Sequence, residues 1–182
     1  MTTRQADERR VPQPVLVLGI GNTVMGDDGA GVRAIERLAE LPLPPHVRLQ
    51  AAPLPGWDLP NWLEGWDAVI LVDAVKMNQP PGAWRRLTLE EIRLLLEDGA
   101  LSLHQPGLAA GLALAQALDR LPKSLTLYGI EPAEIAPGSG LSPAVETSLP
   151  DLAAGIYREL IAAALESRRQ TKQVAIESNK EG

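Results

Sequence analysis

Short, uninterrupted apolar runs are the feature that most constrains how this chain can fold. Residues 15–20 read VLVLGI and residues 68–72 read AVILV. Runs of this length without polar alternation are typical of strands buried on both faces, as in a parallel sheet covered by helices. With the weaker patterns that follow the same reasoning, strands are expected at 15–20, 47–51, 68–74, 83–89 and 125–130.

Apolar residues at helical spacing separate these strands. Val32, Ile35 and Leu38 predict a helix that runs to about residue 41, where prolines end it. Further helices are expected near 57–63, 90–96, 107–121 and 142–166. Ser142 and Pro143 suit the N-cap and the first position of the last of these. Strands alternating with helices predict a doubly wound α/β sheet.

Length and composition fit one domain. The chain has 182 residues, 45% of them apolar, which is enough for a self-sufficient core. We interpret residues 1–13 as a flexible leader, 14–167 as one α/β domain and 168–182 as a polar, disordered tail. The leader does not resemble a signal peptide, and no stretch approaches the roughly 20 apolar residues that cross a bilayer. We therefore expect a cytoplasmic protein with no membrane partner, and the net charge of −6 argues against nucleic-acid binding.

Two acids and a histidine fall near the carboxyl ends of predicted strands. Asp28 follows the first strand, Asp73 ends the third, and His104 lies in a loop leading into a helix. Ligands of doubly wound sheets bind beyond these strand ends. The chain has no cysteine, so a metal here would be held by oxygen and imidazole nitrogen. Two carboxylates and one imidazole would leave coordination positions open for a substrate.

Each of these residues also has a structural explanation. One acid of the Asp27–Asp28 pair is expected to cap the following helix, which leaves Asp28 as the better functional candidate. Asp73 could cap a turn, although a carboxylate on a buried strand is costly unless paired or metal-bound. A lone histidine such as His104 is more often satisfied by hydrogen bonds. His46 has no acidic company and is expected to be exposed, away from the site.

The glycines after the first strand resemble the start of a dinucleotide fingerprint. Gly19 and Gly21 fit it, but the sixth position is Val24 and the two acids would oppose a pyrophosphate. We attribute these glycines instead to a sharp turn and a close backbone approach to a ligand.

Five short motifs, taken in this order, resemble the hydrogenase maturation proteases. The motifs are LGIGN (18–22), GDDGAGV (26–32), VDA (72–74), SLHQ (102–105) and GIEP (129–132). These proteins are endopeptidases that trim the C-terminal extension from the large subunit of [NiFe] hydrogenases. The resemblance covers about residues 15–165. It implies a three-layer fold with a twisted, mostly parallel five-stranded sheet between helices, and nickel contacts from Asp28, Asp73 and His104.

The same resemblance implies a mechanism in which the large-subunit precursor supplies the nickel. We expect Asp28, Asp73 and His104 to lie close enough to share that ion, in a cleft open to solvent. The metal would polarise the scissile carbonyl or activate a water, with one carboxylate as base. Without thiolates, the free protein should hold nickel weakly. Two alternatives stay open: a metal-free peptidase using Asp28 and Asp73 as an acid dyad, and a non-catalytic assembly factor that senses loaded metal.

Overall fold

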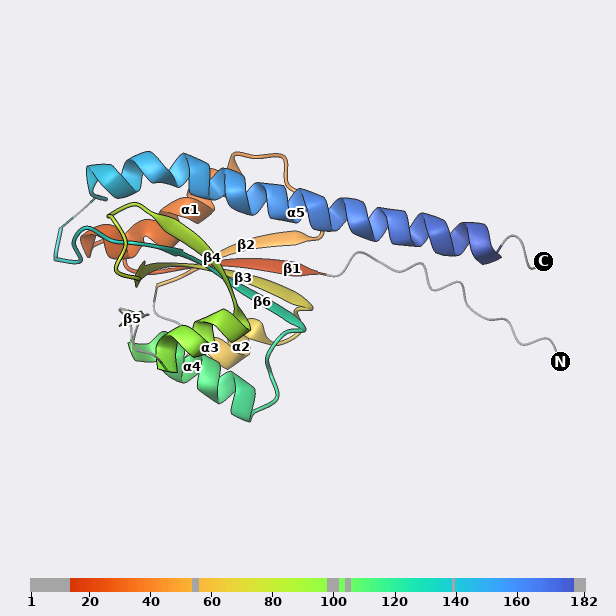
Figure 1. Ribbon diagram of the computed structural model, residues 1–182, viewed down its shortest axis with the longest axis horizontal. Helices are drawn as coiled ribbons and strands as arrows, with labels where there is room; N and C mark the ends of the chain where they lie inside the picture. The colour runs from red at the N-terminus through yellow and green to blue at the C-terminus, as the bar shows by residue number, and fades with distance from the viewer. Residues whose placement is uncertain (1–13, 54–55, 98–101, 104–105, 139, 179–182) are drawn as a thin grey trace.

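A twisted sheet between two layers of helices forms the body of the molecule (Figure 1). The computed structural model describes residues 14–53, 56–97, 102–103, 106–138 and 140–178. Its five main strands are β1 (Val15–Ile20), β2 (Val47–Ala52), β3 (Ala68–Lys76), β4 (Trp84–Thr88) and β6 (Ser124–Ile130). They lie in the order β2-β1-β3-β6-β4, all parallel except β4, which is antiparallel to β6. The predicted mostly parallel α/β fold is confirmed.

A sixth, two-residue strand differs from the sequence expectation. The sequence predicts a loop around His104 and no strand before it, but β5 (Ser102–Leu103) pairs antiparallel with the end of β3. In this pairing Leu103 lies opposite Val75. Two residues are too short for any alternation of apolar and polar residues, so only the contact with β3 identifies this strand.

The described residues form seven helical segments, six between strands and one after the last strand. They are the 3-10 segments η1 (Gly26–Gly29) and η2 (Gly56–Asp58), and the helices α1 (Ala30–Ala39), α2 (Leu59–Leu63), α3 (Leu89–Glu97), α4 (Pro106–Ala117) and α5 (Pro143–Ser178). Buried residues of α1 and α5 pack on one face of the sheet. Buried residues of α2, α3 and α4 pack on the other face. Both faces of the central strands are therefore covered, which explains their uninterrupted apolar sequences.

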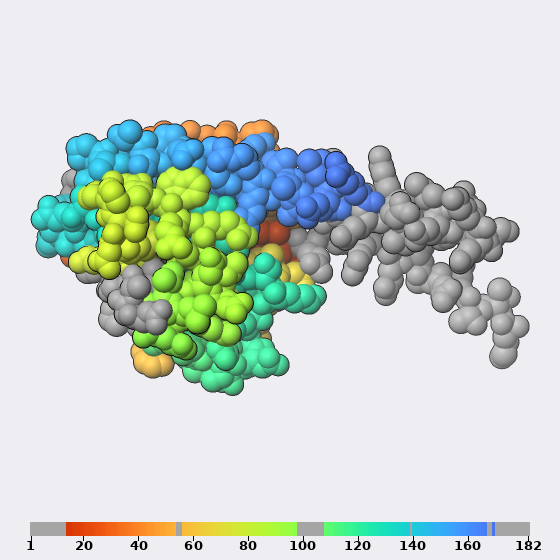
Figure 2. Space-filling view, viewed as in Figure 1, coloured from red at the N-terminus to blue at the C-terminus, as the bar shows by residue number. Residues whose placement is uncertain are grey.

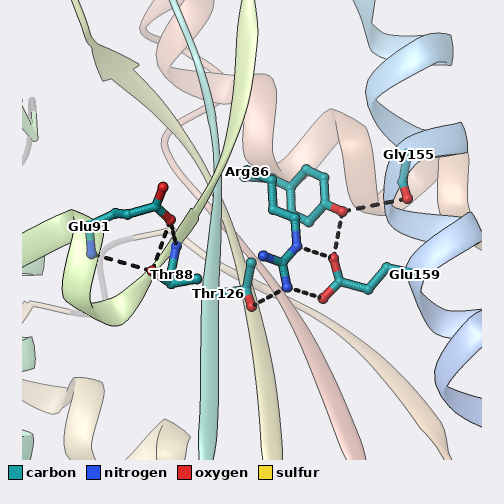
Figure 3. Close-up of polar contacts among 7 residues, drawn as sticks. Arg86, Thr88, Glu91, Thr126, Gly155 and Glu159 are labelled. Carbon is teal, nitrogen blue, oxygen red and sulfur yellow. Dashed lines mark hydrogen bonds and ion pairs between the residues drawn. The ribbon is translucent and has the colours of Figure 1, made fainter.

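A polar network joins α5 to the sheet (Figure 3). Arg86 on β4 donates two hydrogen bonds to the carboxylate of Glu159 on α5, at 2.6 and 3.0 Å. The hydroxyl of Tyr128 on β6 donates to the same carboxylate at 2.7 Å. Burial alone would raise the pKa of Glu159, but the hydrogen bonds from Arg86 and Tyr128 outweigh it, so this pKa is lowered. On the molecular surface, α5 (blue) lies next to β4 (yellow-green) in Figure 2.

The last helix begins where the sequence predicts but ends later. Pro143 is its first residue, and the hydroxyl of Ser142 accepts a hydrogen bond from the backbone N–H of Val145 at 3.4 Å, as expected of an N-cap. The predicted end near residue 166 is wrong, because the backbone stays helical to Ser178 and extends past the sheet (Figure 1). The residues from 168 to 178 include Arg, Gln, Lys and Ala, which favour helix once the docked part has nucleated it.

The predicted leader, residues 1–13, lies outside the described part of the chain. Among the described helices, none combines the length and the apolar character that a membrane span requires. The predicted boundaries of the single domain stay a prediction.

Candidate active site

The candidate site lies at the end of β1, the strand where the order of strands along the sheet reverses. One crossover, through α1, leads to β2 on one side of β1, and a later one, through α2, leads to β3 on the other side. Such a switch point leaves a crevice at the carboxyl ends of the two strands. Asp28 follows β1 in η1, and Asp73 lies on β3. The sequence therefore brings both acids to the same place in the sheet.

Close packing of two glycines draws η1 and α1 onto the strands. A Cβ at Gly31 would overlap the carbonyl oxygens of Ile20 on β1 and Val72 on β3. A Cβ at Gly19 would overlap the carbonyl oxygen of Gly31. Only glycine at both positions lets the start of α1 rest on the backbone of the sheet. The close approach of these glycines to a ligand stays a prediction; what Gly19 approaches in the structure is the backbone of α1.

Asp73 is a buried carboxylate without a described hydrogen-bond partner. The residue is 1% exposed, and among the described residues neither carboxylate oxygen makes a hydrogen bond of normal geometry. Burial, and then the charge of Asp28, raise its pKa well above the ordinary value, and the nearby backbone N–H of Ala74 offsets this only in part. The prediction that Asp73 ends its strand is wrong: β3 continues to Lys76, since β5 pairs with Val75 and Lys76.

Asp28 lies close enough to Asp73 for their charges to interact. It is 4% exposed, and its Oδ2 accepts a hydrogen bond from the backbone N–H of Asn22 at 2.8 Å. The expectation of a cleft open to solvent is therefore wrong for these two side chains. The reason is the glycine packing above, which presses η1 against β3.

Two like charges side by side in a dry site are unfavourable unless a proton or a cation compensates them. A divalent metal ion is a group that such a pair can accept, because carboxylate oxygens are common metal ligands. Asp28 and Asp73 thus have the chemistry of a partial metal site, or alternatively of an acid dyad that shares a proton. Within the described ranges, no three acidic or histidine side chains gather around one point.

The two histidines lie in different parts of the chain. His104 lies outside the described residues, so its predicted place in the site stays a prediction. The described chain reaches Leu103, opposite Val75 and two residues along β3 from Asp73. The carbonyl oxygen of His46 accepts a hydrogen bond from the N–H of Val15, at the amino end of β1. His46 is therefore away from the site, as predicted, but it is half-buried rather than exposed.

Asp27 does not have the capping role that was predicted for it. The N-cap positions of η1 and α1 are Met25 and Gly29, and neither makes a side-chain capping bond. Instead, the buried Asp27 carboxylate accepts hydrogen bonds from the segment that precedes α5. Those partners lie more than a hundred positions away along the chain, which is why no local pattern indicates them.

Glu131 is a buried acid that sequence reasoning missed. Its side chain is 7% exposed, and Oε2 accepts hydrogen bonds from the backbone N–H groups of Met77 at 2.6 Å and Gln79 at 3.2 Å. It directly follows β6, the strand next to β3, so it lies at the same edge of the sheet as Asp73. The signal that could have found it is its place after an apolar strand, the same signal that singled out Asp73.

Comparison with known proteins gives one consistent result. Residues 32–159 match the family model described as hydrogenase maturation protease. A hydrogenase expression/formation protein, HupD of Rhodobacter capsulatus, is 38% identical over 157 residues, which cover 85% of this chain and 75% of that protein. The hydrogenase 2 maturation protease of Escherichia coli is 35% identical, over 74% of this chain and 83% of that protein.

Solved structures agree with the sequence relatives. An endopeptidase from Escherichia coli superposes with a TM-score of 0.73 at 33% identity, over 85% of this chain and 93% of that one. The [NiFe] hydrogenase maturation protease HybD from Thermococcus kodakarensis superposes with a TM-score of 0.69 at 28% identity, over 81% and 99%. Both similarities cover nearly all of the neighbouring chain, so the whole of that fold is shared.

Proposed function

This chain belongs to the hydrogenase maturation protease family, and from that premise we propose a specific reaction for it. It is an endopeptidase, as its named relatives are. We propose that it removes the C-terminal extension of a [NiFe] hydrogenase large-subunit precursor after nickel insertion. In this proposal the nickel arrives with the precursor and is part of the substrate.

The observation that carries the proposal is the buried carboxylate of Asp73 next to a second acid, Asp28. Asp73 is 1% exposed without a described hydrogen-bond partner, and the charge of Asp28 raises its pKa further. Natural proteins pair or protonate such groups, because a lone buried charge costs several kcal/mol or more. A cation brought by the substrate would compensate the buried charge of Asp73 only when the correct precursor is bound. This would make cleavage conditional on nickel.

The residues of this chain then have separable roles. Asp28 and Asp73 supply oxygen ligands, and His104 is proposed to supply an imidazole nitrogen. A nickel ion in this position would act as a Lewis acid toward the scissile carbonyl or the attacking water. One of the two carboxylates takes the proton of that water. The same carboxylate later gives this proton to the leaving amine, which becomes the amino terminus of the released extension.

The experiment that tests the proposal measures the intact mass of the precursor. Nickel-loaded precursor mixed with the protein should lose the mass of its extension, and nickel-free precursor should not. Cleavage of both forms alike would instead favour a metal-free dyad of Asp28 and Asp73. Stable binding of the loaded precursor with no change of mass would favour the non-catalytic assembly factor.

Substitution of the two histidines provides a matched pair. His104→Ala should abolish the mass change, since it removes a proposed ligand. His46→Ala should leave cleavage intact, because His46 lies at the amino end of β1, the opposite edge of the sheet from Asp28. Equal activity of the two variants would remove His104 from the proposed site.

A further inference from the structure

The carboxylate of Asp27 accepts four hydrogen bonds, and the proposed reaction gives this residue no role. Its carboxylate, 1% exposed, accepts from the backbone N–H of Ala133 at 2.7 Å and of Glu134 at 3.2 Å. It also accepts from Ser142, from the backbone N–H at 2.6 Å and the hydroxyl at 2.8 Å. Oδ2 accepts three of these bonds and Oδ1 accepts one, so most of the acceptor capacity of this carboxylate is used within the protein. The charge of Asp27 is therefore compensated by donors of the protein itself.

The backbone around Asp27 is tied to the same segment, residues 131–142. The N–H of Asp27 donates to the carbonyl oxygen of Glu134 at 3.2 Å. The N–H of Gly26 donates to the carbonyl oxygen of Gly138 at 3.3 Å, and the N–H of Gly138 donates to that of Val24 at 3.0 Å. The same segment therefore holds both the side chain and the backbone of Asp27. Because Asp28 is the next residue, these contacts also restrict its position.

The other end of this segment is tied to the loop after β3. Glu131 accepts from the backbone of Met77 and Gln79, and its own N–H donates to the carbonyl oxygen of Ala83 at 2.8 Å. Residues 131–142 therefore connect the loop that carries Asp28 to the loop that follows the strand of Asp73. We call these residues the brace.

We propose that Asp27 is a positioning residue, which fixes Asp28 beside Asp73 by locking the β1–α1 loop onto the brace. The proposal rests on the proposed function for the role of Asp28. Asp27 does not touch substrate; it acts through the neighbouring residue. Because a misplacement of about 1 Å at a reacting group can cost on the order of a hundredfold in rate, loss of the lock should be visible in catalysis.

The test replaces the carboxylate by the amide of the same shape. In Asp27→Asn the side-chain NH₂ must face one of the N–H or O–H donors that now point at an oxygen, so at least one of the four bonds is lost. We expect kcat for nickel-loaded precursor to fall at least about tenfold while KM changes less than about threefold, since only the reacting geometry is disturbed.

A second readout on the free protein needs neither nickel nor precursor. The N–H of Asn22 donates to Asp28 Oδ2 at 2.8 Å, so the amide proton resonance of Asn22 reports the position of that carboxylate. We expect this resonance to shift in Asp27→Asn. Tyr128→Phe is the matched control: it removes a hydrogen bond to Glu159 in the network of Arg86, so it should lower the melting temperature without moving the Asn22 resonance or kcat.

Ser142 provides a milder variant in case Asp27→Asn does not fold. Ser142→Ala removes one of the four donors, and Ser142→Thr retains the hydroxyl. We expect Ser142→Ala to shift the Asn22 resonance and lower kcat in the same sense as Asp27→Asn, and Ser142→Thr to restore both toward the wild-type values.

The outcomes separate this inference from the proposed function. If Asp28→Asn abolishes cleavage while Asp27→Asn and Ser142→Ala leave kcat and the Asn22 resonance unchanged, Asp27 is not a positioning residue. If the resonance shifts as expected but Asp28→Asn cleaves at the wild-type rate, the lock exists and the proposed role of Asp28 is wrong.

Discussion

Three of the four buried acids near the carboxyl ends of the strands differ clearly in what surrounds them. Asp27 and Glu131 accept backbone hydrogen bonds, which compensate the charge that burial would otherwise disfavour. Asp73 has no such described partner and faces the charge of Asp28. Burial by itself therefore does not identify a functional acid; the absence of compensation does. Of these three acids, Asp73 is therefore the strongest candidate for a carboxylate that binds a ligand.

The first prediction concerns Asp73→Asn, which keeps the shape and removes the charge. The folded-state pKa of Asp73 is raised, so the native state binds its proton more readily than the unfolded state does. Stability from this group is then lost as pH rises from about 4 through the folded-state pKa. Asp73→Asn should melt at a higher temperature than the wild type at pH 7, with the difference shrinking toward pH 4, yet lose at least about a hundredfold in cleavage.

Thermal melts at several pH values, paired with the mass assay, check this prediction. A variant that is less stable than the wild type at pH 7 would mean that Asp73 has a compensating partner in the free protein. Wild-type cleavage by the variant would remove Asp73 from the site.

At the scale of elements, the position of α1 depends on two glycines. Gly19 and Gly31 let this helix approach β1 and β3 closely enough for their carbonyl oxygens to lie where a Cβ would be. The helix carries η1, and with it Asp28, toward β3. The position of Asp28 therefore depends on the close packing of Gly19 and Gly31, which have no Cβ.

The second prediction follows from that contact. Gly31→Ala should destabilise the protein by about 3 kcal/mol or more, because the added methyl group meets two backbone oxygens that cannot move aside. Gly138→Ala is the control: a Cβ there meets nothing within 4 Å, and the free energy of unfolding should stay within about 0.5 kcal/mol. Urea unfolding measures both. Equal stability of the two variants would show that α1 can shift without cost.

At the scale of the whole molecule, α5 both packs on the sheet and extends beyond it. Among its residues of described exposure, Leu160 is the last that is buried. The third prediction is that removing residues 170–182 shifts the melting temperature by less than about 2 °C and leaves cleavage unchanged, since every residue described as buried is kept. Calorimetry should contrast it with removal of residues 156–182, which deletes buried Ile156 and Leu160 and should unfold the protein. A large loss from the shorter truncation would mean that this end of α5 docks.

The fourth prediction concerns where the metal resides. The proposed site has two acids and one histidine and no thiolate, so the free protein should bind nickel weakly. Protein treated with a chelator, then freed of it by gel filtration, should cut nickel-loaded precursor at the untreated rate. Nickel added to the protein alone should not make it cut nickel-free precursor. Stoichiometric metal in the purified protein, with activity lost on its removal, would show that the metal is resident.

The sequence by itself determined the places of the five main strands and the class of fold. The run VLVLGI matches β1 residue for residue, and Ser142 with Pro143 marks the start of α5. These features are local: a strand buried on both faces is apolar throughout, and a serine N-cap bonds to a backbone N–H only three residues further on. The order of strands and helices then places Asp28 and Asp73 at one switch point.

Only the tertiary structure decided what each acid does there. Two adjacent aspartates look alike in the sequence, yet Asp27 accepts hydrogen bonds from donors more than a hundred positions away, and Asp28 lies beside Asp73. The extension of β3 past Asp73 likewise depends on β5, from a distant part of the chain. Side-chain partners are set by how the folded chain brings remote segments together, and a pattern confined to neighbouring residues carries no record of those contacts.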